Sequence, residues 1–194
     1  MTSLIWNPLW QLSVPDPFDL NANGSTTFKG AVGDVFLPED YLSFMQIAGG
    51  AALRDRGSWF IAKFLDERLT CEIEWLGNTS SVMFSTWDFY TEPERNLLPQ
   101  QFVSIGYAEV RQPCSEKFEA NHGGNVVIQV DRNSLDYGKV YLWIKPSKSF
   151  ENIDTWMKGN NNIGLGYIAE SFNDFMNDFK SAAYFGEKLG FYEK

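Results

Sequence analysis

Short segments rich in aromatic and β-branched residues recur along the middle of the chain, and polar turns separate them. Helical periodicity is strongest at the two ends of this series. A regular alternation of strands and helices would favour a parallel sheet, whereas helix, strands, helix favours an antiparallel one. The sequence therefore predicts an α+β fold, a largely antiparallel β-sheet packed with helices. We expect strands over residues 58–64, 70–76, 81–87, 102–108, 125–131 and 138–144.

The strand expected at 138–144 is apolar on both faces, which is typical of a central strand. Its side chains are Val140, Leu142 and Ile144 on one face and Tyr141 and Trp143 on the other. We expect it to pair with 125–131 across the polar turn between them. Trp59 and Trp143 are expected inside the core.

The stretch "LPEDYLSFMQIAGG", residues 37–50, predicts the first helix. Pro38 suits a first helical position, and Glu39 and Asp40 suit the positive end of the helix dipole. One apolar stripe should face the core, and it consists of Tyr41, Phe44, Met45 and Ala48. Gly49 and Gly50 are expected to end the helix and to turn the chain into the sheet.

Residues 168–179, "IAESFNDFMNDF", predict the last helix, with Ser171 as N-cap and Asp174 three residues later. Its buried stripe should be Phe172, Phe175, Met176 and Phe179. Across the chain, the predicted core includes Leu37, Tyr41, Phe44, Ile128, Val140, Leu142, Phe172 and Phe175.

The length of 194 residues fits one well-buried core. Residues 1–25 contain three prolines and are expected to form an extended arm, which docks through Trp6, Trp10 and Phe18. Residues 26–182 should form a single domain, and 183–194 a C-terminal extension. The sequence does not establish what the arm does or whether the chain forms oligomers.

The net charge of −9 argues against nucleic acids and anionic membranes as partners, and favours a basic protein. The N-terminus lacks the pattern of a signal peptide, and no stretch is apolar enough to span a membrane, so we expect a cytoplasmic location. Cys71 and Cys114 are more typical of two thiols in a reducing compartment than of a bridge, although their pairing stays open.

No pattern in the sequence favours an enzyme. His122 is the single histidine and follows no metal-binding signature, so neither a metal nor another cofactor is expected. The Gly-Gly sequence at 123–124 and the Gly-Leu-Gly sequence at 164–166 lack the surrounding residues of phosphate-binding loops. Carboxylate pairs of the glycosidase type stay conceivable among 25 acidic residues, and exposed tryptophans could stack on sugars, but nothing selects either.

Five short motifs, taken in order, resemble the SUKH superfamily, also known as the Smi/Knr family. They are the Leu-Pro helix ending in two glycines at 37–50, Ile105-Gly106, "GGNVVIQVD" at 123–131, Gly138-Lys139-Val140, and Ala169-x-Ser171-Phe172. The resemblance implies an SUKH-like single domain without catalysis that neutralises a cognate intracellular toxin, often a nuclease, by direct binding. A regulatory scaffold of the Smi/Knr type without a toxin partner is the alternative.

Under this interpretation, the partner-binding residues should be carboxylates around aromatic anchors in the loops between the strands. Two segments have this composition. The candidate residues are Asp66, Glu67, Trp87, Asp88, Phe89, Tyr90, Glu92 and Glu94.

Overall fold

The computed structural model describes residues 10–12, 37–47, 51–53, 58–64, 67–77, 102–111, 123–144 and 164–180. The helices in these ranges are α1 (Glu39–Ile47) and α4 (Phe172–Asn177). The strands are β1 (Trp10–Leu12), β2 (Ala51–Leu53), β3 (Trp59–Lys63), β4 (Arg68–Leu76), β5 (Phe102–Val110), β6 (Gly123–Gln129), β7 (Val140–Trp143) and β8 (Leu165–Ala169). The predicted strand 81–87 and the expected helix end at Ala48, Gly49 and Gly50 lie outside the described residues.

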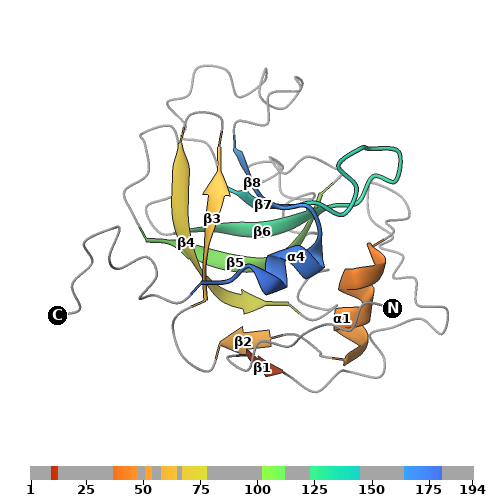
Figure 1. The fold of residues 1–194 in the computed structure, drawn as a ribbon, viewed down its shortest axis with the longest axis horizontal. Coiled ribbons are helices and arrows are strands. Elements are labelled where there is room, and N and C mark those ends of the chain that lie inside the picture. The colour runs from red at the N-terminus through yellow and green to blue at the C-terminus, as the bar shows by residue number, and fades with distance from the viewer. Residues whose placement is uncertain are drawn as a thin grey trace, which may run out of the picture.

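The six strands β3 to β8 pair in a closed ring, and every pairing is antiparallel. β4 pairs with β3 and β5, and β6 and β7 continue the order from β5 to β8. The ring closes where Lys63 of β3 lies opposite Tyr167 of β8. Figure 1 shows β3 and β4 crossing the direction of β5 and β6, as expected for a strongly bent sheet. The antiparallel sheet is thus confirmed, but the described part of the chain is mostly β, with two short helices.

β2 extends this sheet at the far end of β4, because Ala51 and Ala52 lie opposite Leu76 and Trp75. β1 pairs in turn with β2, so part of the predicted N-terminal arm is a short strand of the sheet. The chain therefore enters the sheet directly after α1, as the two glycines suggested. The remainder of the arm lies outside the described residues.

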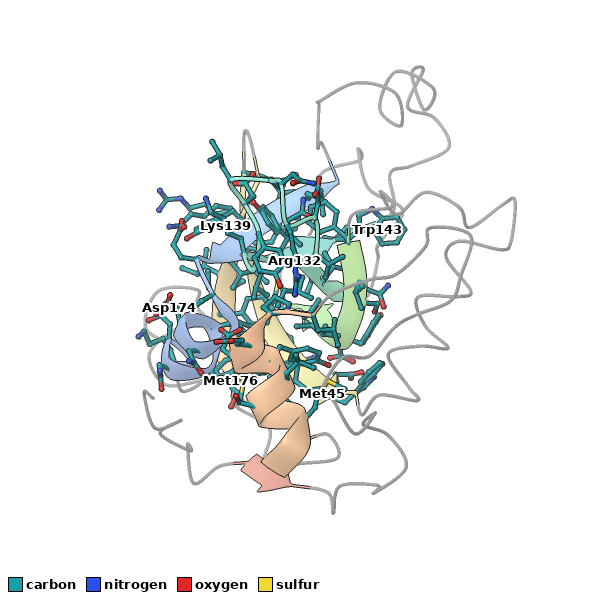
Figure 2. All side chains as sticks on the ribbon, turned by 90° about the vertical axis from the view of Figure 1, so that its right-hand side faces the viewer. Met45, Arg132, Lys139, Trp143, Asp174 and Met176 are labelled. Atoms are coloured by element: carbon teal, nitrogen blue, oxygen red, sulfur yellow. The ribbon has the colours of Figure 1, made fainter. Side chains whose placement is uncertain are left out.

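One face of each ring strand contributes to a single core that α1 and α4 complete. The eight residues listed as the predicted core of the chain, from Leu37 to Phe175, are all buried, whereas Phe179 of the last predicted stripe is only partly buried. The opposite face carries a second, smaller cluster, in which Phe102, Val127, Trp143 and Leu165 are buried beside Tyr141. Figure 2 shows Trp143 on the side turned away from α4. β7 contributes to both clusters and lies between β6 and β8, which confirms that it is a central strand.

The two helices meet at a joint built from the residues that carry the family resemblance. The Tyr41 and Phe172 rings pack edge to face with centroids 4.9 Å apart, and Phe44 lies 5.0 Å from Phe172. Ser171 caps α4, since its Oγ accepts a hydrogen bond from the Asp174 N–H at 3.1 Å. The N-cap and its partner are therefore confirmed.

Two sequence predictions are wrong in part. The last helix was expected over 168–179, but residues 168 and 169 belong to strand β8, because their backbone pairs with β7, and α4 runs only from Phe172 to Asn177 after its Ser171 cap. Trp59 was expected in the core but is only half-buried. Its neighbour Phe60 points into the main core, so Trp59 lies on the opposite face of β3, where it pairs with Glu72.

Candidate functional site

Most of the candidate residues chosen from sequence fall outside the described residues. This applies to Asp66 and to all of Trp87, Asp88, Phe89, Tyr90, Glu92 and Glu94. Glu67 is described, and it precedes β4, where its carbonyl accepts a hydrogen bond from the Phe64 N–H at 2.8 Å. Whether these residues come together is therefore not tested, and their role stays a prediction.

The outward face of β4 and β5 carries carboxylates around aromatic rings, the composition that the sequence analysis expected in the loops. Glu72 of β4 lies opposite Glu109 of β5, and Trp75 lies opposite Tyr107. Glu74 sits between these two pairs along β4. We call these five residues, Glu72, Glu74, Trp75, Tyr107 and Glu109, the acidic face.

A β-bulge explains why β4 can present both Glu74 and Trp75 on this face. Strict alternation would turn Trp75 toward the core, but the register shifts between Ile73 and Trp75 so that Glu74 is an extra residue. Ile73 and Leu76 on either side are buried in the main core. Bulges re-aim side chains in this way and recur next to functional sites.

Arg111 lies at the centre of the charges on the acidic face. Its Nε donates to Oε2 of Glu72 at 2.6 Å, and its guanidinium also pairs with Glu109. Glu72 is 4% exposed, and a buried carboxylate needs an oppositely charged, hydrogen-bonded partner such as this one. The Arg111 N–H donates to the carbonyl of Thr70 at 2.9 Å, which fixes the residue at the end of β5.

The three carboxylates of Glu72, Glu74 and Glu109 face the single guanidinium of Arg111, which leaves net negative charge. This excess affects the pKa of Glu74. Partial burial raises the pKa of the Glu74 carboxyl, as do its hydrogen bond to Glu109 and the charge of Glu109. Burial also raises the pKa of the Tyr107 phenol, with further contributions from Glu74 and Glu109. An approaching cation would relieve this repulsion, so the acidic face is suited to a lysine or arginine side chain.

Gly123 lets β5 and the Tyr107 ring pack closely on β6. A Cβ atom there would come within 2.3 Å of the Ala108 carbonyl oxygen and within 2.6 Å of the Tyr107 hydroxyl oxygen. A Cβ at Gly124 would approach the Trp143 carbonyl to 2.5 Å, and one at Gly166 would meet the Phe64 ring. These glycines permit close packing between strands, which accounts for them without a phosphate ligand.

A sequence signal for the acidic face does exist. In "TCEIEWL", Glu72 and Glu74 alternate with the apolar Cys71 and Ile73, which indicates one acidic and one buried face. The pairing of this face with Glu109 and Tyr107 depends on register and on the bulge, and neither can be derived from one strand.

Other chemistry is sparse in the part of the chain that the structure describes. Cys71 is buried, and its thiol donates to the carbonyl of Leu69 at 3.7 Å. Cys114 and His122 lie outside the described residues. Among those that are described, no group of His, Cys, Asp and Glu side chains could hold a metal ion, and no helix is long and apolar enough to cross a membrane.

Comparison of the chain with models of known protein families, with curated proteins and with solved structures finds no match.

Proposed function

We propose that this protein is a non-catalytic, SUKH-like immunity protein that binds and neutralises a basic intracellular toxin. The acidic face is the observation that carries the proposal. It combines an exposed, a half-buried and a buried carboxylate with two half-buried aromatic rings on two paired strands. Binding surfaces of this composition attract basic partners through charge and retain them through desolvated rings.

The repulsion within the acidic face supports the binding of a positively charged partner. Arg111 already forms ion pairs with Glu72 and Glu109, and Glu74 shares a hydrogen bond with Glu109. A lysine or arginine from a toxin would supply the positive charge that these carboxylates still lack. A nuclease is a suitable toxin class, since a protein that binds polyanions carries a basic surface.

The joint between α1 and α4 gives further support, because it accounts for the family-like motifs as parts of a scaffold. Tyr41, Phe44 and Phe172 are fully buried there. Side chains buried in this way cannot contact a partner, so recognition falls to the surface. Immunity proteins against different toxins would need the same buried scaffold but different surface residues.

Co-expression with the product of a toxin-like gene adjacent to this one tests the proposal. We expect the chain to restore growth and to form a stable complex with the purified toxin. Glu74→Lys together with Trp75→Ala should weaken both effects. Asp178→Lys, which reverses an exposed carboxylate on the end of α4, should leave them unchanged. Absence of both rescue and complex formation by the wild-type chain would contradict the proposed function.

A further inference from the structure

The loop between β6 and β7, residues 131–139, projects from the sheet beside α1 and α4 (Figure 1). It carries Leu135, whose side chain is 100% exposed. Single exposed aliphatic residues are ordinary on protein surfaces. Leu135 differs from them because the loop beneath it has its conformation fixed by hydrogen bonds.

The first half of the loop is held by its own polar groups. The Asp131 carboxylate accepts a hydrogen bond from the Asn133 N–H at 2.9 Å, and the Asp131 carbonyl accepts one from the Ser134 N–H at 3.0 Å. On the far side of Leu135, the Ser134 hydroxyl accepts from the Asp136 N–H at 3.1 Å. The Ser134 carbonyl accepts from the Tyr137 N–H at 3.2 Å. Leu135 is thus presented on a turn closed from both sides.

The base of the loop is tied to three other parts of the fold. The Gly138 N–H donates to the Gln129 carbonyl at 2.9 Å, and the φ of Gly138 is 87°, which favours glycine. Gly138 lies beside Pro38, the residue before α1, because a Cβ atom on it would be 3.8 Å from the Pro38 ring. The Lys139 ammonium lies 2.9 Å from the Asp136 carboxylate and 3.3 Å from that of Glu170, which follows β8. Residues of the family-like motifs therefore hold this loop in place.

A side chain on a preformed loop loses little conformational entropy when it binds, so it contributes efficiently to affinity. A convex tip with one aliphatic side chain fits a concave apolar pocket in a folded protein. The loop and the adjacent Glu170 carry three carboxylates and two cations, so their formal charges sum to −1. The carboxylates are Asp131, Asp136 and Glu170, and the cations are Arg132 and Lys139. This excess disfavours anionic lipid and a second copy of this acidic chain, and it favours a basic protein.

We propose that residues 131–139 form a preformed anchor loop that inserts Leu135 into an apolar pocket of the basic toxin. The inference rests on the proposed function and adds a second contact to the acidic face. The loop follows the Gln129 end of β6, whereas Glu109 lies opposite Gly123 at the other end. Six residues of strand separate the two by about 20 Å. A standard interface of about 800 Å² per partner can span both.

The test uses the full chain and the toxin that it neutralises in the co-expression assay. Leu135→Gln removes the apolar side chain at the tip without changing the charge. The matched control is Ile61→Thr on β3, because Ile61 is the other exposed large hydrophobic residue among those described. We expect Leu135→Gln to raise the Kd by about tenfold to a hundredfold, mainly through faster dissociation. The control should change it less than about twofold, and Leu135→Gln should keep the wild-type unfolding midpoint, since that side chain is fully exposed.

Wild-type affinity in Leu135→Gln would overturn the anchor loop and leave the proposed function standing. Equal losses in the two variants would overturn it as well, because they would indicate general surface stickiness. The anchor loop also fails if Leu135 drives binding to phosphatidylserine vesicles, or self-association in sedimentation. If the wild-type chain neither rescues nor binds the toxin, the proposed function fails and the anchor loop fails with it.

Discussion

The Asp40 carboxylate accepts a hydrogen bond from the backbone N–H of Asn173 at 3.0 Å, which links two residues 133 positions apart in sequence. The same side chain accepts from the Tyr41 N–H at 2.8 Å through its other oxygen. Asp40 thus satisfies an N–H in the first turn of α4 from the first turn of α1. Helix N-termini leave such groups unpaired, so this one side chain serves both helices.

We expect Asp40→Ala to lower the free energy of unfolding by about 1–2 kcal/mol, as the loss of a helix cap typically does. Asp40→Asn retains a side-chain oxygen and should lose less. Urea unfolding followed by circular dichroism measures both. Glu39→Ala is the control from the same turn, because that side chain is exposed. Equal losses for Asp40→Ala and Glu39→Ala would show that the link to Asn173 contributes no stability.

Phe172→Ala should lower the free energy of unfolding by about 3–5 kcal/mol, because it leaves a cavity at the joint between the helices. Phe172 is fully buried against Tyr41 and Phe44. Phe179→Ala is the comparison, since Phe179 is only partly buried at the far end of the same aromatic cluster. Chemical denaturation should therefore rank the two variants in this order. A loss below about 1 kcal/mol at Phe172 would contradict its packing role.

The sequence predicted the elements whose periodicity is strong and local. Ser171 and Asp174 marked the start of α4 because a capping box is a local signal. The two apolar faces of residues 140–144 correctly indicated a central strand. The core positions of the strands followed from the same alternation, and those of the helices from helical spacing.

The sequence did not predict the features that depend on pairing between distant strands. Leu165–Ala169 is a short apolar run that precedes a helix cap, and the pairing with β7 decides its strand conformation. The closure of the ring depends on one register position between Lys63 and Tyr167, which no local pattern encodes. The acidic face was missed for the same reason, since the bulge at Glu74 follows from pairing with β5.

The carboxyl of Glu74 should make the stability of the protein depend on pH. Its pKa is raised by partial burial and by Glu109, with Glu72 adding repulsion and Arg111 opposing it. A carboxyl with a raised pKa favours the folded state while it is protonated, and this contribution is lost as the pH rises through that pKa. Glu74→Gln, which carries no charge at any pH, should therefore be more stable than the wild type at neutral pH.

Unfolding free energies of the wild type and Glu74→Gln, measured from about pH 4 to about pH 8, check this expectation. The advantage of the variant should grow as the pH rises. Glu67→Gln, at the start of β4 and away from Glu109, is the matched control. A pH-independent difference would mean that Glu74 does not titrate against its neighbours.

Association with the toxin distinguishes the acidic face from the segment 87–94. If the acidic face meets the toxin, Glu74→Lys should slow association, because complementary charge accelerates encounter. Trp75→Ala should instead speed dissociation, since a desolvated ring holds a complex after it forms. Raising the salt from about 50 mM to about 500 mM should slow association of the wild type far more than it changes dissociation.

The double change Glu92→Lys with Glu94→Lys tests the other segment in the same stopped-flow assay. If the sequence-based prediction is right, this variant slows association, and Trp87→Ala or Tyr90→Ala speeds dissociation. If both segments contact the toxin, each set of changes has its own effect, and combined variants should show additive losses because separate sites act independently. Reversal of charge at Glu74 without any change in association or rescue would remove the acidic face from the interface. The same result for Glu92 and Glu94 would remove the loop segment.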